Sequence, residues 1–131
     1  MTLTNEQIEL VAEAVHESLR AYKKLIEQEQ GPTWLYLNEE DKTILIKIVT
    51  RLVDGKPVGT KEIHDWWVEY KEELGWQHGP VKNYFKKTHP CLVNYWSLPY
   101  KERLKDIIIR QMVTLYASVY GVVIDHPIFS K

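Results

Sequence analysis

The chain has 131 residues, of which 17 are Lys or Arg and 18 are Asp or Glu, and its net charge is −1. This length suits one domain with its own hydrophobic core, and the near-neutral charge excludes the broad positive field of a protein that grips duplex nucleic acid. The single cysteine, Cys91, excludes an internal disulfide and fits a reducing compartment. We expect a soluble, cytoplasmic protein, because no stretch approaches the ~20 apolar residues of a membrane span and the first residues carry no secretory signal.

Two helices are predicted in the first part of the chain. The first begins at Thr4, where Gln7 completes a capping box, and its apolar residues recur at helical spacing until Gly31-Pro32 stops it. The second begins near Asn38 and runs to Val53. Its first turn carries three acidic residues, which the positive end of the helix dipole favours.

Two further helices follow a predicted turn at residues 54–57. The third helix starts after Thr60, buries one apolar face and ends at Gly75. The fourth begins around Pro99, because proline suits the first position of a helix, and Gly121 is its C-terminal cap. About 24 residues with no helical or strand period lie between these two helices, and a connection of that length inside a compact domain is usually functional.

These elements predict a mainly α fold: a small bundle of about four helices with a long ordered loop between the third and the fourth. We expect one domain over residues 1–131, made of an N-terminal helical half (1–58), a second half that contains the loop (59–121) and a tail (122–131). The tail begins Val122-Val123-Ile124 and is too apolar to be free, so we expect it to dock on the body or on a partner.

The two halves resemble one another in sequence. Val15-His16-Glu17 parallels Ile63-His64-Asp65 in constant register with the apolar residues that follow, and Trp34-x-x-Leu37 parallels Tyr95-x-x-Leu98, each before a predicted helix. We hypothesise two related helix-loop-helix halves, the second with an enlarged loop. The alternative is coincidence, because amphipathic helices share a period by construction.

The long loop is the predicted site. Between Leu74 and Lys101 there is no Asp or Glu, whereas lysines, histidines and aromatic residues are frequent. Aromatic faces can stack on a planar ring while ammonium and N–H groups meet phosphate, so we expect a small anionic, nucleotide-derived ligand. The alternative is that the aromatic side chains fix the loop to the core and the lysines are solvated. The predicted ligand-binding residues are Trp76, His78, Gly79, Lys82, Lys86, Lys87, His89 and Tyr95.

Other chemistry is not favoured by the sequence. His78, His89 and Cys91 match no standard zinc spacing and lack a fourth ligand, so neither a metal nor another cofactor is expected. Cys91 beside His89 could form a nucleophile and base, but a small buried hydrophobic residue is the better interpretation of that cysteine. We expect no catalytic residues and no enzymatic activity.

A family resemblance rests on the loop and the helix before it. The motifs are Gly75-Trp76-x-x-Gly79-Pro80-Val81, Lys87-Thr88-His89-Pro90-Cys91-Leu92-Val93-x-Tyr95 and Leu98-Pro99, with His64-Asp65-x-Trp67 upstream. Over about residues 60 to 120 the chain resembles the ryanodine-receptor repeat, or RyR domain, and its N-terminal half resembles the extension of stand-alone bacterial and phage members. The resemblance implies a mainly helical fold without known catalytic activity, and nucleotide-derived ligands have been proposed for prokaryotic members. The structural residues of the motif would be His64, Trp67, Pro80 and Pro90.

The predicted function is therefore non-enzymatic binding, for sensing or sequestration, of a small anionic ligand. The alternative is a protein-interaction or structural module that uses the same loop, Trp96, Tyr100 and the apolar tail, and it predicts a flat apolar patch in place of a concave pocket. An enzyme would need a strongly perturbed His or Cys in the site, and single-stranded nucleic acid fits the neutral charge poorly. Membranes and duplex nucleic acid are not expected partners, and homo-oligomerisation stays open.

Overall fold

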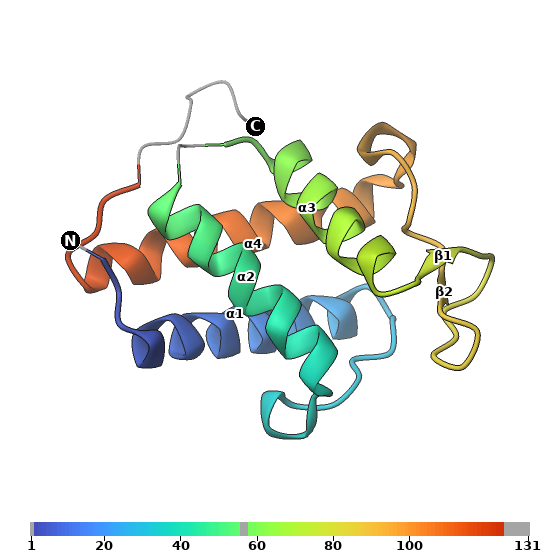
Figure 1. Ribbon diagram of the computed structural model, residues 1–131, viewed down its shortest axis with the longest axis horizontal. Helices are drawn as coiled ribbons and strands as arrows, with labels where there is room; N and C mark the ends of the chain where they lie inside the picture. The colour runs from blue at the N-terminus through green and yellow to red at the C-terminus, as the bar shows by residue number, and fades with distance from the viewer. Residues whose placement is uncertain (1, 56–57, 125–131) are drawn as a thin grey trace.

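The computed structural model describes residues 2–55 and 58–124, and it confirms the mainly helical fold. The four helices are α1 (Asn5–Leu25), α2 (Glu39–Asp54), α3 (Thr60–Glu73) and α4 (Tyr100–Val119). In Figure 1, α1 and α4 run along the long axis of the molecule, and α2 and α3 cross in front of them. Two short 3₁₀ helices, η1 (Trp34–Tyr36) and η2 (Tyr95–Ser97), precede α2 and α4.

The helix starts are set by local side-chain caps. Thr4 and Gln7 form the predicted capping box, with the Gln7 amide donating to Thr4 Oγ1 over 3.1 Å and the Thr4 amide donating to Gln7 Oε1 over 2.9 Å. Asn38 Oδ1 caps α2 by accepting from the Asp41 amide over 2.8 Å. Pro99 is the N-cap of α4, next to its predicted place as the first helical residue.

The predicted end of the first helix is wrong. α1 ends at Leu25, six residues before Gly31-Pro32, because Glu27 adopts a left-handed conformation (φ 60°) that helical backbone cannot continue. By contrast, the end of α4 is as predicted: Gly121 has φ 85°, and the Val122 amide donates to the Ala117 carbonyl over 2.8 Å.

The core lies between all four helices. Fully buried side chains come from each of them, such as Val15, Ile48, Ile63 and Val113. Val122, the first residue of the expected docked tail, is buried in this core and Ile124 packs against it. The rest of that tail (125–131), and residues 56 and 57 of the predicted turn, lie outside the described residues.

The two halves share a histidine contact. His16 Nε2 lies 2.8 Å from the Pro32 carbonyl, and His64 Nε2 lies 2.8 Å from the Val93 carbonyl. Each carbonyl belongs to the residue two places before the aromatic residue that opens the following 3₁₀ helix. Those aromatic residues, Trp34 and Tyr95, also contact the two histidine rings at centroid distances of 5.9 and 6.0 Å.

The ends of α1 and α3 also match. In α1 the Gln28 amide donates to the Lys23 carbonyl over 2.8 Å, and in α3 the Trp76 amide donates to the Lys71 carbonyl over 3.0 Å. The residue before each donor is in the left-handed region. Lys23 and Lys71 therefore occupy equivalent positions, and these shared contacts support the hypothesis of two related halves.

Candidate functional site

The long connection from α3 to α4 contains a small parallel pair of strands that the sequence did not predict. β1 (Gln77–His78) pairs with β2 (Thr88–His89), and η2 follows. Gly79 is needed for this pairing, because a Cβ atom at that position would lie 2.6 Å from Thr88 Cβ. Gly79, one of the predicted ligand-binding residues, thus has a packing role in the loop.

Trp76 is buried at the start of this loop. It is 4% exposed, and its Nε1 donates to Glu40 Oε1 over 2.9 Å. The Lys71 ammonium lies 4.2 Å from the centroid of its ring and also forms an ion pair of 2.6 Å with Asp41. Burial alone would raise the pKa of Asp41, but the ion pair with Lys71 lowers it overall. Trp76 therefore offers no open face for stacking in this structure.

The Lys87 side chain also contacts the helical body of the protein. Its Nζ donates to the Leu74 carbonyl over 2.8 Å and lies 4.0 Å from Glu40 Oε2. The acid-free loop is thus partly neutralised by Glu40 and Asp41, which begin α2 more than thirty residues upstream. Of the other predicted loop residues, His78, Lys82 and Lys86 are exposed, as are Pro80 and Pro90 of the motif.

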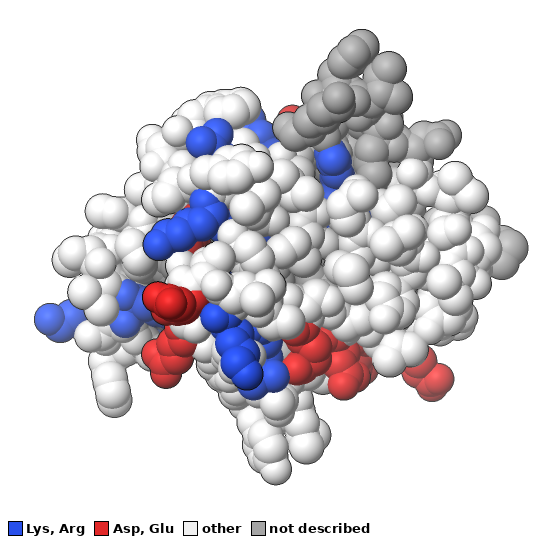
Figure 2. All heavy atoms as spheres, turned by 180° about the vertical axis from the view of Figure 1, so that it is seen from behind, with Lys and Arg blue, Asp and Glu red and all other residues white. Residues whose placement is uncertain are grey.

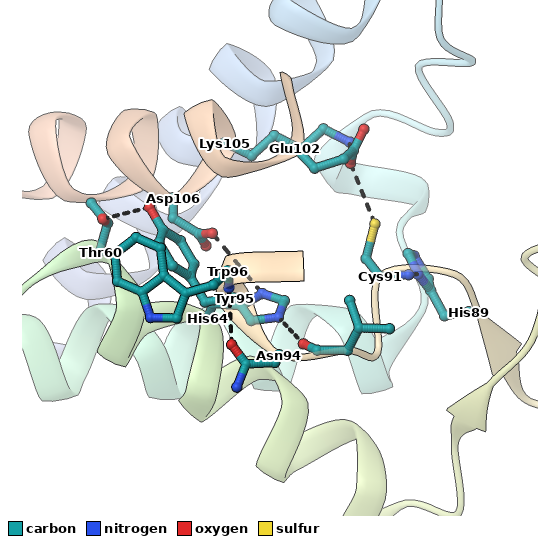
Figure 3. Close-up of polar contacts among 11 residues, drawn as sticks. Thr60, His64, His89, Cys91, Asn94, Tyr95, Trp96, Glu102, Lys105 and Asp106 are labelled. Atoms are coloured by element: carbon teal, nitrogen blue, oxygen red, sulfur yellow. Dashed lines mark hydrogen bonds and ion pairs between the residues drawn. The ribbon is translucent and has the colours of Figure 1, made fainter. Parts of the chain in front are cut away.

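Tyr95 is buried elsewhere, between α3 and α4 (Figure 3). It is 5% exposed, and its hydroxyl shares a hydrogen bond of 2.9 Å with Thr60 Oγ1. The adjacent His64 lies 4.0 Å, from Nδ1 to Oδ2, from Asp106, and burial raises the pKa of that carboxyl to about 8. Tyr95 and Trp76 have separate sets of contacts, so they do not form one aromatic surface.

His89 and Cys91 are held in neutral forms. His89 Nδ1 accepts from the Cys91 amide over 3.0 Å, which leaves the ring proton on Nε2, and burial together with nearby Lys82 lowers the His89 pKa to about 4. The ring packs edge-on against Trp67 at 5.0 Å. The Cys91 thiol donates to Glu102 Oε1 over 3.5 Å, and burial together with that carboxylate raises its pKa to about 12. These states oppose a thiolate nucleophile.

Lysines from separate elements act electrostatically on His89 and on Lys23. Glu102 accepts hydrogen bonds from Gln28 (2.6 Å) and Lys105 (2.7 Å). Lys23 is half-buried on α1, and among the described residues its ammonium has neither a hydrogen bond nor a carboxylate within 4.0 Å. Burial, then the charges of Lys105 and Lys82, lower its pKa to about 8. The pKa of His89 is likewise lowered by the charges of Lys82, Lys71 and Lys105. We define the lysine cluster as Lys23, Lys71, Lys82 and Lys105.

The lysine cluster carries excess positive charge. Lys71 pairs with Asp41 at 2.6 Å and Lys105 pairs with Glu102 at 2.7 Å, whereas among the described residues Lys23 and Lys82 have no carboxylate within 4.0 Å. Figure 2 shows the face opposite to that of Figure 1, on which the visible basic side chains lie mainly over the half toward the loop, with acidic side chains among them, and further acidic side chains lie along the lower edge of the other half. A local excess of positive charge of this kind attracts anions.

Sequence reasoning found Lys82 and His89 of this site but missed Lys23, Lys71 and Lys105. These three residues lie on helices outside the loop, where a lysine is ordinary. One signal could have found two of them: Tyr22-Lys23 and Tyr70-Lys71 occupy matching positions in the internal repeat.

Two surface grooves lie beside α2 and α3, with volumes of about 260 and 370 Å³. Neither is lined by residues of the loop 75–98. Within residues 2–55 and 58–124, no group of three or more His, Cys, Asp or Glu side chains is placed to hold a metal ion. The helices of the same residues are too short or too polar to cross a bilayer.

Comparison with known proteins identifies the family. The family model of the RyR domain matches residues 42–125, which is more than half of the chain and extends from α2 through α4. No solved structure matches the chain. The match contains the loop, most of the lysine cluster and the buried His64 contacts. The chain belongs to the RyR domain family.

Proposed function

We propose that this protein is a non-enzymatic module that binds a small, nucleotide-derived anion at the lysine cluster. The observation that carries the proposal is Lys23, a half-buried ammonium without a partner that lies near Lys105 and Lys82. Holding an unpaired cation away from water and beside like charges costs free energy. A bound anion would remove that cost, so binding should stabilise the folded protein most when the ligand is negatively charged.

The groups around the cluster suit a phosphate. The ammonium groups can act as charged donors, and neutral His89 adds an Nε2–H donor whose tautomer is fixed by the Cys91 amide. Tyr84 is 51% exposed and lies under the Lys82 ammonium at 5.0 Å, so it offers an aromatic face for a base. The protonated Cys91 thiol supports a binding role over a catalytic one, and the lone cysteine supports a cytoplasmic setting.

The test is a thermal-unfolding screen of the purified protein with mononucleotides, dinucleotides, cyclic nucleotides and adenosine-ribose compounds. Inorganic phosphate and sulfate are the controls for simple charge. A ligand at a hundred times its dissociation constant adds roughly 2.7 kcal/mol to the free energy of unfolding. We expect a selective increase that is lost in Lys23→Met and kept in Lys24→Met, a matched change at an exposed position on the same helix. Equal responses of the two variants, or no response to any nucleotide, would count against the proposal.

A second candidate function is a protein-interaction module. The observation that favours it is a set of large apolar side chains left in solvent near the loop. Phe85 is fully exposed, and Val81, Trp96 and Tyr100 are each at least 65% exposed. Large apolar side chains left in solvent on one connection of the chain are candidates for a contact surface.

A further inference from the structure

The tip of the loop presents one phenylalanine on a fixed turn. Phe85 makes no use of its ring inside the fold, since the whole side chain is in solvent. Yet its backbone is held: Asn83 Oδ1 accepts from the Phe85 amide (2.9 Å) and from the Lys86 amide (3.0 Å). Asn83 also exchanges two backbone hydrogen bonds with Thr88. An aromatic side chain on such a turn can enter a partner's pocket with little further loss of backbone entropy.

The groove of about 260 Å³ between α2 and α3 could accept an aromatic side chain that has a basic neighbour. Ile44, Tyr70 and Leu74 supply its apolar lining. Three acids, Glu39, Glu40 and Glu73, and one exposed lysine, Lys47, whose ammonium lies 5.2 Å from the centroid of the Tyr70 ring, give its lining a net negative charge. Its volume is below the ~300–1,000 Å³ of pockets that take small molecules, and it suits a single side chain.

We propose that two copies of this chain associate by placing Phe85 of each copy in the α2–α3 groove of the other. The exposed Lys86 beside Phe85 then meets the acidic side chain of Glu73. Lys87 Nζ donates to the carbonyl of Leu74 in the groove wall over 2.8 Å, and the Tyr84 hydroxyl donates to Asp41 over 3.4 Å, so the loop tip lies beside the groove. Because the two surfaces are neighbours, a two-fold axis makes the contact reciprocal and closes the assembly as a dimer.

The first test measures the mass of the full chain by light scattering after size exclusion, over a hundredfold range of concentration. We expect a dimer that dissociates on dilution for the wild type, and a monomer for Phe85→Ser. Leu115→Ser is the matched control, because Leu115 is 61% exposed on α4 and belongs neither to the loop nor to the groove lining, and it should behave as wild type. A wild type that stays monomeric at every concentration, or a Phe85→Ser variant that dimerises as wild type does, overturns the proposal.

A charge exchange tests the pairing of tip with groove. Lys86→Glu sets an acidic residue of the tip against Glu73, and Glu73→Lys sets Lys86 against a second lysine, so each variant alone should dimerise at least tenfold more weakly. In a 1:1 mixture both contacts of the heterodimer regain opposite charges, and wild-type affinity should return. A mixture no tighter than its components would rule out this arrangement. None of these changes touches Lys23, so the anion proposal stands or falls separately.

Discussion

Replacing Lys23 with methionine should stabilise the ligand-free protein at pH 7. Methionine keeps an unbranched apolar stem but removes the ammonium that has no partner. The pKa of Lys23 falls from its usual 10.5 to about 8. A pKa difference of about 2.5 corresponds to about 3.4 kcal/mol, at about 1.36 kcal/mol for each pKa unit. Solvent reaches part of this half-buried side chain and screens the charge, so we expect a gain of about 1–2 kcal/mol in the free energy of unfolding.

The gain should also depend on pH. In the unfolded chain Lys23 binds its proton more tightly than in the folded protein, so the folded state is penalised in full below pH 8. The penalty disappears as the pH rises from about 8 to 10.5, because Lys23 then loses its charge in both states. The wild type should therefore approach the variant in stability over this range.

Urea unfolding of wild type, Lys23→Met and Lys24→Met at several pH values between 7 and 10.5 measures both effects. The control removes the charge of an exposed neighbour on α1 and should change the free energy of unfolding by less than about 0.5 kcal/mol. A Lys23→Met variant that is less stable than wild type at pH 7 would refute the reasoning, as would a gain that persists unchanged at pH 10.5.

Three further predictions concern the neighbourhood of the loop. Asp106→Asn should be more stable than wild type at pH 9 by about 2 kcal/mol or more in urea unfolding. Burial raises the Asp106 pKa from its usual 3.8 to about 8, so the wild type loses stability as the pH rises from the first value through the second; the difference should vanish below pH 4, and a difference that does not change with pH would contradict the prediction. Gly79→Ala should cost about 1–3 kcal/mol by chemical denaturation, because the new Cβ collides with Thr88, and an unchanged midpoint would show that the strands can separate freely. Cys91 should react with iodoacetamide far more slowly in the folded protein than in urea, because its thiol has a pKa of about 12; equal rates would remove the case for a protonated thiol.

The helix positions could be predicted because their signals are local. Thr4 with Gln7, and Asn38 with the acids that follow it, mark helix starts within four residues of sequence, and the structure has these caps. The early end of α1 could not be predicted in this way. Glu27 takes up the left-handed conformation for which a sequence search expects glycine or asparagine.

The candidate site was predicted less well, because its partners are distant in sequence. Trp76 and Tyr95 are residue types that suit a stacking surface. In the structure both are hydrogen-bonded within the fold, Trp76 to Glu40 and Tyr95 to Thr60. The absence of acids in the loop suggested an open basic surface, whereas the start of α2 supplies the missing carboxylates. A pattern along the chain cannot reveal which far residue will pack beside a side chain, and that choice decides whether an aromatic ring binds a ligand or the core.

The matching ends of α1 and α3 give the lysine cluster an internal reference. Lys71 finds its carboxylate in Asp41, the third residue of α2. The third residue of α4 is Glu102, but Lys105 and Gln28 occupy it, and Lys23 is left without the counterion that its counterpart has. The matching helix ends thus differ at one charge. Under the proposed function, an anion bound beside Lys23 would play the part that Asp41 plays for Lys71, and its charge would stand in for a carboxylate of the fold.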